Sequence, residues 1–563
     1  MARFDTLIRG GTVVDGSRRP PFQADVGITD GRIDAVGSFA AHDAGQVIDA
    51  DSMLVTPGFI DLHTHYDSQI YWDPYCTISG WHGVTSVVIG NCGFGFAPCR
   101  PADQDRAMLT LSRNEAVPLA TMKAGMPWDW ETYPEFLDSL ERTAKGVNVL
   151  SYLGLSPLMA YVMGTDDAKG RPATPAEQSR MCHLLEEAMD AGCCGFSAQV
   201  LGESSVQRDF DGTPMITDTM ARDDLYALAA VLGRLERGFT QFMGGGFAMH
   251  EKVAEVSGRP VIYNLMAASG VDQHGVLTEM NERIIDWLVE CNERGLEIYA
   301  QALVAESASE FTLEDWNLYD ASPVWREFTL GDPNDRMPRL TDPAWRQRLI
   351  DEYDRGEAPA TIVGERFEDL IVENQSVMGG GHTVGEIARR RGCHPVEAML
   401  DVAHETDLGA VFATPPMEMD YDVVARIANA DYSIPGVSDG GAHTKFLTLG
   451  AYTTEFLVNS VRDHEIMPIE DAIWRLSGYP AQAAGFRDRG TLSPGAPADV
   501  LVIDYDRLAL GPRERAFDFP ENEWRRVRRA EGYRITMVNG EVTFDDGVCT
   551  GATPGLLLRH GHG

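Results

Sequence analysis

The chain has 563 residues, of which 44% are apolar, and it carries 85 acidic against 47 basic side chains, a net charge of −38. This length exceeds one simple core, so we expect a large α/β domain with a smaller satellite domain. A chain this acidic is repelled by phosphate backbones and anionic membranes, which argues against nucleic acid and membrane surfaces as partners.

The cellular setting is predicted from the cysteines and the apolar runs. Nine cysteines in so long a chain do not resemble the disulfide framework of a small secreted protein. The first residues, MARFDTLIRGGTVVDG, contain no apolar segment of a secretory signal. No apolar run approaches the roughly 20 residues that a membrane helix needs. We therefore predict a reduced, soluble, cytoplasmic protein.

The two ends of the chain share one sequence pattern. Residues 1–57 alternate apolar and polar side chains and turn at Gly-Gly and Asp-Gly pairs, which predicts short β-strands. Residues 488–552 do the same in GAPADVLVIDYD and ITMVNGEVTFDDG. We predict one small β-domain assembled from both ends of the chain.

The middle, residues 58–487, alternates short apolar runs with amphipathic helical segments. Eight such units occur between FIDLHTH and YSIPGVSDG, which is the count of a (β/α)8 barrel, although a doubly wound open sheet would alternate in the same way. Between the seventh and eighth units, residues 305–380 are long, aromatic and irregular. Loops of this length are usually lids or binding loops, so we predict an insertion of that kind.

The first strand of the middle region carries two histidines, His63 and His65. Alternate residues of a strand face the same side, so these imidazoles project together. At the carboxyl end of a barrel strand they would point into the mouth, where active sites of that fold lie. Imidazole is a good ligand for zinc. The alternative is a pair of partly buried histidines with ordinary hydrogen-bond partners.

Several motifs in the right order resemble the amidohydrolase superfamily. They are LIRGGTVVDG, VIDADSMLVTPGFIDLHTHYD, GNCGFGFAP, VSDGGAHT and DRGTLSPGAPADVLVIDYD. More narrowly, the chain is similar to the D-aminoacylases, the N-acyl-D-amino-acid deacylases. The resemblance implies a metal-dependent (β/α)8 TIM-like barrel with a β-sandwich formed by the two termini.

The resemblance also implies a ligand set. His63 and His65 match the metal ligands of the first strand, Cys92 matches a cysteine that ligates or bridges metal, and Asp439 matches an aspartate that contacts the metal and moves protons. The alternatives are a cysteine that packs as a small hydrophobe and an aspartate that caps a Gly-Gly turn. His443 is a further candidate, which would ligate metal, orient Asp439 or donate to the substrate.

Two expected histidines are missing. The group normally carries one after the fifth strand and one after the sixth, whereas GFTQFMGGG and VIYNLMAAS contain none. Gln241 and Asn264 stand roughly in their places, and amides are weaker zinc ligands than imidazoles. His274 is an alternative ligand, while His250 is expected to be structural. A Tyr-Pro-Tyr run expected near the seventh strand is also absent.

We predict a hydrolase that cleaves the non-peptide C–N bond of an N-acyl amino acid or similar small amide with a metal-activated water. One divalent ion is favoured over two, and zinc over other metals. One alternative is an enzyme of the same fold that acts on an ester, a cyclic amide or a C–C bond. Another is a non-catalytic relative that binds a small ligand. Association into a homo-oligomer stays open.

Overall fold

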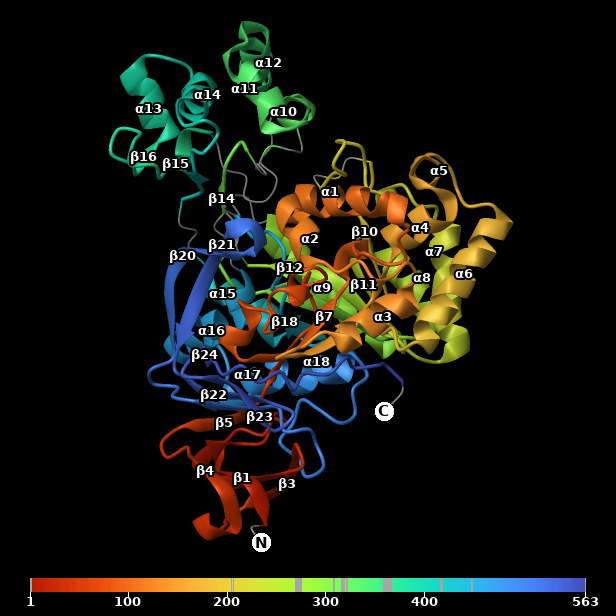
Figure 1. Ribbon diagram of the computed structural model, residues 1–563, viewed down its shortest axis with the longest axis vertical. Helices are drawn as coiled ribbons and strands as arrows, with labels where there is room; N and C mark the ends of the chain where they lie inside the picture. The colour runs from red at the N-terminus through yellow and green to blue at the C-terminus, as the bar shows by residue number, and fades with distance from the viewer. Residues whose placement is uncertain are drawn as a thin grey trace.

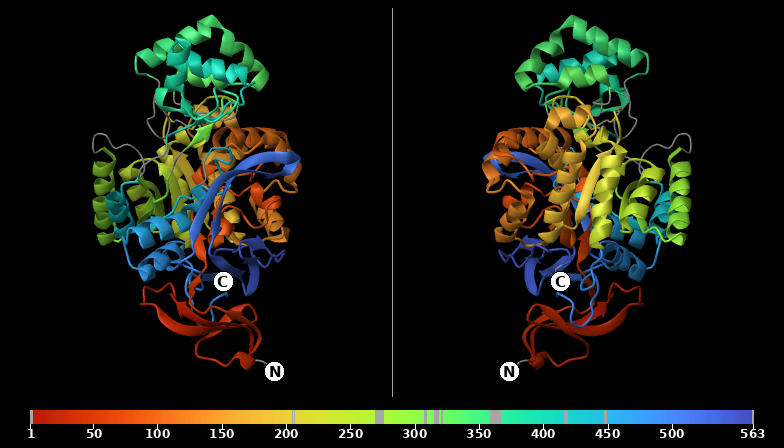
Figure 2. Two further views of the ribbon diagram at one scale, coloured as in Figure 1. Left: turned by 90° about the vertical axis from the view of Figure 1, so that its left-hand side faces the viewer. Right: turned by 90° about the vertical axis from the view of Figure 1, so that its right-hand side faces the viewer.

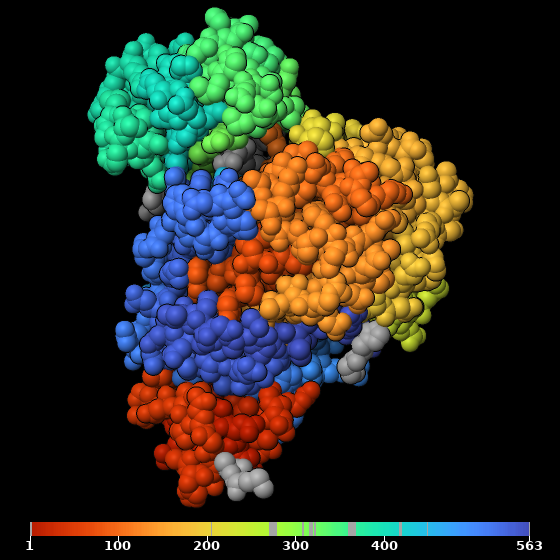
Figure 3. All heavy atoms as spheres, viewed as in Figure 1, coloured from red at the N-terminus to blue at the C-terminus, as the bar shows by residue number. Residues whose placement is uncertain are grey.

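The computed structural model describes residues 3–561, apart from 204, 206, 269–275, 307–308, 315–318, 320–321, 358–366, 416–418 and 447–448. Strands of the N-terminus lie at one end of the molecule, a body of helices and strands occupies the middle, and an insertion projects from the other end (Figures 1 and 3). In the described part of the chain, no helix has the length and apolar character to cross a bilayer.

Parallel strands run through the centre of the body. A three-stranded sheet has the order β6-β7-β8, and a six-stranded sheet has the order β9-β10-β11-β12-β13-β18. The strands are β6 (Phe59–Asp61), β7 (Val84–Ile89), β8 (Asn148–Ser151), β9 (Leu153–Gly154), β10 (Gly195–Val200), β11 (Phe239–Gly244), β12 (Val261–Ala267), β13 (Ile298–Leu303) and β18 (Ser433–Pro435). Most are buried on both faces, which explains their continuous apolar runs.

The first and last of these strands come together. A parallel bridge joins Thr64, just after β6, to Gly440, just after β18. The amide of His65 donates to the carbonyl of Gly440 at 2.6 Å. The segments that carry the predicted ligands of the first and last strands are therefore neighbours. The α/β class is confirmed, and closure into a barrel stays a prediction.

Helices pack around the parallel strands, and one large apolar cluster contains side chains from both the helices and the strands. Local signals start several of them: at α6, Thr174 and Glu177 form a capping box, and Pro175 occupies the first helical position. The body helices are α1 (Gln104–Glu115), α2 (Leu119–Gly125), α3 (Tyr133–Arg142), α4 (Leu155–Met163), α5 (Thr165–Gly170), α6 (Pro175–Asp190), α7 (Arg222–Leu235), α8 (Phe247–Ser257), α9 (Val276–Glu293), α15 (Tyr421–Asn429), α16 (Tyr452–Glu455), α17 (Ile469–Leu476) and α18 (Gly478–Ala483).

Both ends of the chain contribute to one nine-stranded sheet. Its N-terminal strands are β1 (Phe4–Val13), β2 (Phe22–Thr29), β3 (Arg32–Gly37), β4 (Ala44–Asp49) and β5 (Leu54–Pro57). Its C-terminal strands are β19 (Val500–Ile503), β22 (Tyr533–Val538), β23 (Glu541–Asp545) and β24 (Val548–Cys549). The two halves join where β5 pairs with β19. A sandwich with the predicted domain boundaries stays a prediction.

A long hairpin, β20 (Ala509–Phe519) with β21 (Glu523–Glu531), leaves the C-terminal strands and runs along the body toward the insertion (Figure 2). The amide of Arg526 in this hairpin donates to the carbonyl of Thr444 at 2.7 Å. The hairpin therefore supports the loop that follows Asp439.

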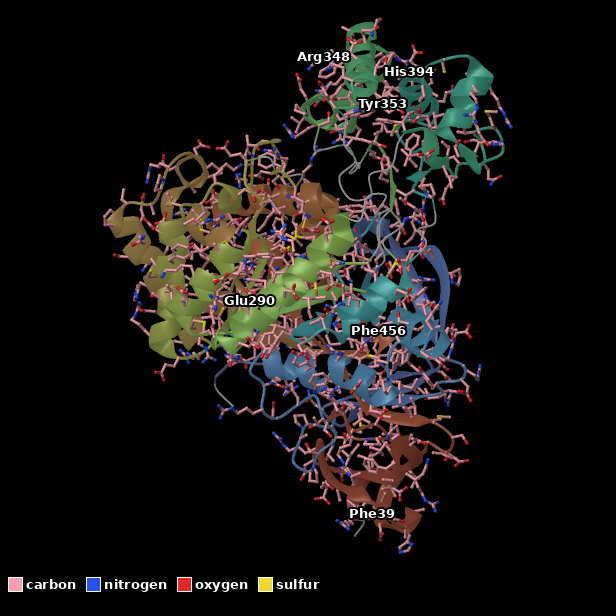
Figure 4. The ribbon with its side chains drawn as sticks, turned by 180° about the vertical axis from the view of Figure 1, so that it is seen from behind. Phe39, Glu290, Arg348, Tyr353, His394 and Phe456 are labelled. Atoms are coloured by element: carbon pink, nitrogen blue, oxygen red, sulfur yellow. The ribbon has the colours of Figure 1, made fainter. Side chains whose placement is uncertain are left out.

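The insertion comprises the described residues between 309 and 415. It contains β14 (Glu310–Phe311), α10 (Pro323–Thr329), α11 (Pro333–Thr341), α12 (Pro343–Asp354), β15 (Ile371–Val372), β16 (His382–Thr383), α13 (Val384–Arg391), α14 (Pro395–Glu405) and β17 (Phe412–Ala413). Tyr353 packs against His394 with ring centroids 5.5 Å apart, and both lie at the opposite end of the molecule from Phe39 (Figure 4). The predicted lid at 305–380 falls partly outside the described residues.

Candidate metal centre

The two histidines of the first strand are buried and lie side by side. His63 and His65 are 0% and 2% exposed, and their ring centroids are 5.3 Å apart. The hydroxyl of Ser438 donates to the carbonyl of His63 at 3.0 Å, so the last strand holds this segment as well. The structure thus brings both imidazoles to one point beside the end of the last strand.

Cys92 and Asp439 reach the same point. Asp439 Oδ1 lies 3.1 Å from His63 Nε2 and 3.7 Å from His65 Nε2, and Cys92 Sγ lies 3.3 Å from His63 Nε2. Cys92 and Asp439 both have left-handed backbones, with φ values of 55° and 47°. Such backbone strain persists where the surroundings determine it and is concentrated at functional sites.

The donor set suits a divalent cation. The ligand atoms of His63, His65 and Cys92 lie within 4.8 Å of one another. Tetrahedral zinc, with bonds of about 2.0–2.3 Å, places neighbouring ligand atoms roughly 3.3–3.8 Å apart, close to the spacing of these atoms. His63, His65 and Cys92 therefore have the chemistry and the proximity of a zinc site, and Asp439 lies beside the two histidines.

The acidities of Asp439 and Cys92 add to this fit. Burial raises the pKa of Asp439, but contacts from His443 and the two first-strand histidines outweigh it and hold the pKa well below its ordinary value. Burial also raises the pKa of the Cys92 thiol, yet the same two histidines bring it below its ordinary value. Both shifts favour the anionic forms of the two side chains, which suit a cation.

Amides lie on the strands where the two missing histidines were expected. Gln241 on β11, Asn264 on β12 and Gln301 on β13 are buried and hydrogen-bonded in a chain, which we call the amide ladder. Its links are Gln241 Nε2 to Asn264 Oδ1 and Asn264 Nδ2 to Gln301 Oε1, both 2.8 Å long. The three amides are therefore hydrogen-bonded to one another, and the ladder lies beside His63.

The amide ladder has a direction. The backbone N–H of Cys92 donates to Gln241 Oε1 at 2.8 Å, so Gln241 presents its nitrogen to Asn264. Asn264 in turn presents its nitrogen, a donor, to His63 Nδ1 at 3.0 Å. A neutral imidazole whose Nδ1 accepts carries its proton on Nε2. His63 thus becomes a metal ligand at Nε2 only after that proton moves to Nδ1 and the Asn264 amide turns over.

His65 has no such constraint, because among the described residues its Nδ1 has no hydrogen-bond partner. His65 therefore needs no such rearrangement to bind a metal, whereas His63 needs the reversal of one amide.

His443 lies on the far side of Asp439, as one of its predicted roles requires. Its Nε2 is 3.5 Å from Asp439 Oδ2, and its Nδ1 is 3.2 Å from Oε2 of Glu115. Sequence reasoning did not find Glu115. It ends α1 as one acidic residue among many, and no local pattern connects it to a histidine so distant in the chain.

The other candidates lie elsewhere. His250 is in α8, where it contacts the carbonyl of Gly246 at 2.8 Å and packs against Phe242, so the structural interpretation is confirmed. His274 lies outside the described residues.

Comparison with known proteins identifies relatives over the whole chain. The profile of the amidohydrolase family matches residues 46–544. An uncharacterized protein of Mycobacterium tuberculosis is 29% identical over 97% of this chain and 92% of its own length. The D-aminoacylase of Alcaligenes xylosoxydans xylosoxydans is 26% identical over 99% of this chain and 97% of its own length.

A solved structure shares the fold. It is the N-acyl-D-glutamate deacylase of Bordetella bronchiseptica, complexed with zinc and a phosphonate inhibitor that mimics the tetrahedral intermediate. The TM-score is 0.67 at 24% identity, and the match covers 99% of this chain and 100% of that chain.

Proposed function

The chain belongs to the amidohydrolase family and is similar to its D-aminoacylases, and from that premise we propose that it is a metal-dependent hydrolase of N-acyl amino acids or similar small amides. The parallel strands would close into a (β/α)8 barrel, and the strands of both termini would form the accompanying β-sandwich. The observation that carries the proposal is the buried cluster of His63, His65 and Cys92, with Asp439 Oδ1 beside both imidazoles.

Those four residues would hold one divalent ion, with zinc favoured by their nitrogen and sulfur donors. When bound, such an ion supplies a Lewis acid that activates water and polarises a carbonyl. No other chemistry is required of it in this proposal.

Asp439 would transfer the proton. Its Oδ1 lies between the two imidazoles, and its Oδ2 faces His443. As a carboxylate beside the bound ion, it would accept a proton from the attacking water. It would then deliver that proton to the leaving nitrogen, while His443 holds its second oxygen.

The test combines metal analysis with a substrate panel. Protein purified without chelator is analysed for metal and assayed on N-acyl-D- and N-acyl-L-amino acids. We expect about one ion per chain and turnover of an amide, both lost in the His63→Ala, His65→Ala double variant. The matched control is His42→Ala, His183→Ala, which removes two exposed histidines. If the His63→Ala, His65→Ala variant keeps both its metal ion and its turnover, the proposal is wrong.

The amide ladder supports a second candidate function. With amides in place of two imidazoles, the site has a different set of polar groups beside the substrate, which favours another bond. In this second candidate the bond cleaved in the substrate is an ester, a cyclic amide or a C–C bond and not an N-acyl bond. Bound metal with turnover of an ester or a cyclic amide, and none of N-acyl amino acids, would select this candidate. Protein without any bound metal would instead favour a non-catalytic binding relative.

A further inference from the structure

We propose that Glu115 is a positioning residue of the metal centre, which holds the imidazole of His443 and, through it, the carboxylate of Asp439. This inference rests on the metal-dependent function proposed above. It concerns residues that lie on the opposite side of Asp439 from His63 and the amide ladder.

The first argument is burial. Glu115 is 1% exposed, and its carboxylate reaches His443 Nδ1 at 3.2 Å. Removing a carboxylate from water is costly unless a partner compensates, so its burial here requires the imidazole. The Glu115 carboxylate and the His443 imidazole are therefore close ion-pair partners inside the protein.

The second argument is the backbone around Glu115. Ala116, directly after it, has a left-handed backbone with φ of 51° and ends α1. The amide of Thr444 donates to the carbonyl of Glu115 at 3.3 Å, and the hydroxyl of Thr444 donates to the carbonyl of Ala116 at 2.6 Å. Because Thr444 follows His443, the end of α1 binds the histidine's loop with backbone and side chain together.

The third argument is the geometry of the ring. Both nitrogens of His443 face a carboxylate, with Glu115 at Nδ1 and Asp439 Oδ2 at Nε2. The ring also packs against Phe446, with centroids 4.7 Å apart. The imidazole thus lies between two carboxylates, with Oδ2 of Asp439 on its side and Oδ1 of Asp439 on the side of the first-strand histidines. Groups that orient ligands in this way typically change metal affinity or activity by about 10–100-fold.

The experiment measures zinc affinity by competition with a chromophoric chelator, using the full chain. Glu115→Gln keeps the size of the side chain and removes its charge, and His443→Asn removes the atom that faces Asp439. We expect each to weaken zinc binding by about 10–100-fold. In the His443→Asn background we expect Glu115→Gln to weaken zinc binding no further, because the glutamate acts through the histidine. The matched control is Glu352→Gln, the same change at a buried glutamate of the insertion, and it should leave the dissociation constant unchanged.

The outcomes separate the two proposals. Wild-type protein that binds no zinc overturns both. Wild-type protein that binds zinc, with Glu115→Gln equal to it, overturns only the role of Glu115, as do additive effects in the double variant. If Glu115→Gln does not fold, Glu115→Asp shortens the side chain and keeps its charge. It should weaken zinc binding measurably, and an unchanged dissociation constant there refutes the inference.

Discussion

Asn264→Asp is expected to tighten zinc binding, although it changes no ligand. In the wild-type chain the Asn264 nitrogen lies between His63 Nδ1 at 3.0 Å and Gln301 Oε1 at 2.8 Å, while its oxygen accepts from Gln241. Aspartate has the same size but offers only acceptors. It therefore accepts a hydrogen bond from a protonated His63 Nδ1, which leaves Nε2 without a proton and free to bind metal.

The magnitude follows from the contacts. A hydrogen bond to a charged group contributes roughly 1.5–3 kcal/mol, against about 1 kcal/mol for a neutral one. The substitution also removes the need to reverse the Asn264 amide on metal binding, while Gln301 must turn its own amide to donate. The two amide reversals roughly offset each other, so we expect a net gain of about 0.5–2 kcal/mol, which is roughly a 2–30-fold tighter dissociation constant.

The assay is the same zinc competition, accompanied by thermal unfolding with and without zinc. Without zinc, the buried carboxylate should destabilise Asn264→Asp by a few kcal/mol, and zinc should restore more stability to it than to the wild type. Asn264→Leu is the control, because it removes the donor without supplying an acceptor. If Asn264→Asp binds zinc no more tightly than the wild type, the deduced direction of the amide ladder is wrong.

Two further predictions concern stability. Burial lowers the pKa of both His82 and His250 to about 4, below the roughly 6.5 of an exposed histidine, so the unfolded chain binds more protons between these values. Stability is thus fully present above pH 6.5 and falls as the pH drops toward 4, by about 3 kcal/mol for each residue. His82→Gln should remove its share of this slope in urea unfolding, and an unaltered slope would contradict the assignment. Arg489→Met should cost about 3–5 kcal/mol, since it leaves the buried Asp499 without its cation at 3.1 Å. A midpoint of urea unfolding equal to that of the wild type would contradict this second prediction.

The sequence carries a local signal for some of the site and none for the rest. The side-by-side imidazoles of His63 and His65 follow from the two-residue period of a strand, which is visible in seven residues. Cys92 and Asp439 required a family resemblance, because nothing in their own segments says which strand ends will meet. The shared terminal sheet was visible as two strand-rich ends, but the pairing of β5 with β19 depends on the fold of everything between them.

Gln241 and Asn264 show where sequence reasoning stops. Their positions were identified, because each replaces an expected histidine on a recognisable strand. Their role was not, since it depends on a bond from the Cys92 backbone 149 residues away, which sets the orientation of every amide behind it. Hydrogen-bond direction is a property of the assembled network, and no single segment encodes it.

The two sides of the site act on the metal in opposite ways. Behind His63, the amide ladder favours a proton on the nitrogen that a metal would need, which weakens binding. Behind Asp439, Glu115 and His443 hold a carboxylate in place, which strengthens it. Metal affinity in this chain then depends on the balance between two groups of residues, the amide ladder and the Glu115–His443 pair. Asn264→Asp and Glu115→Gln shift that balance in opposite directions, and because the two residues share no contact, their effects on zinc affinity should add.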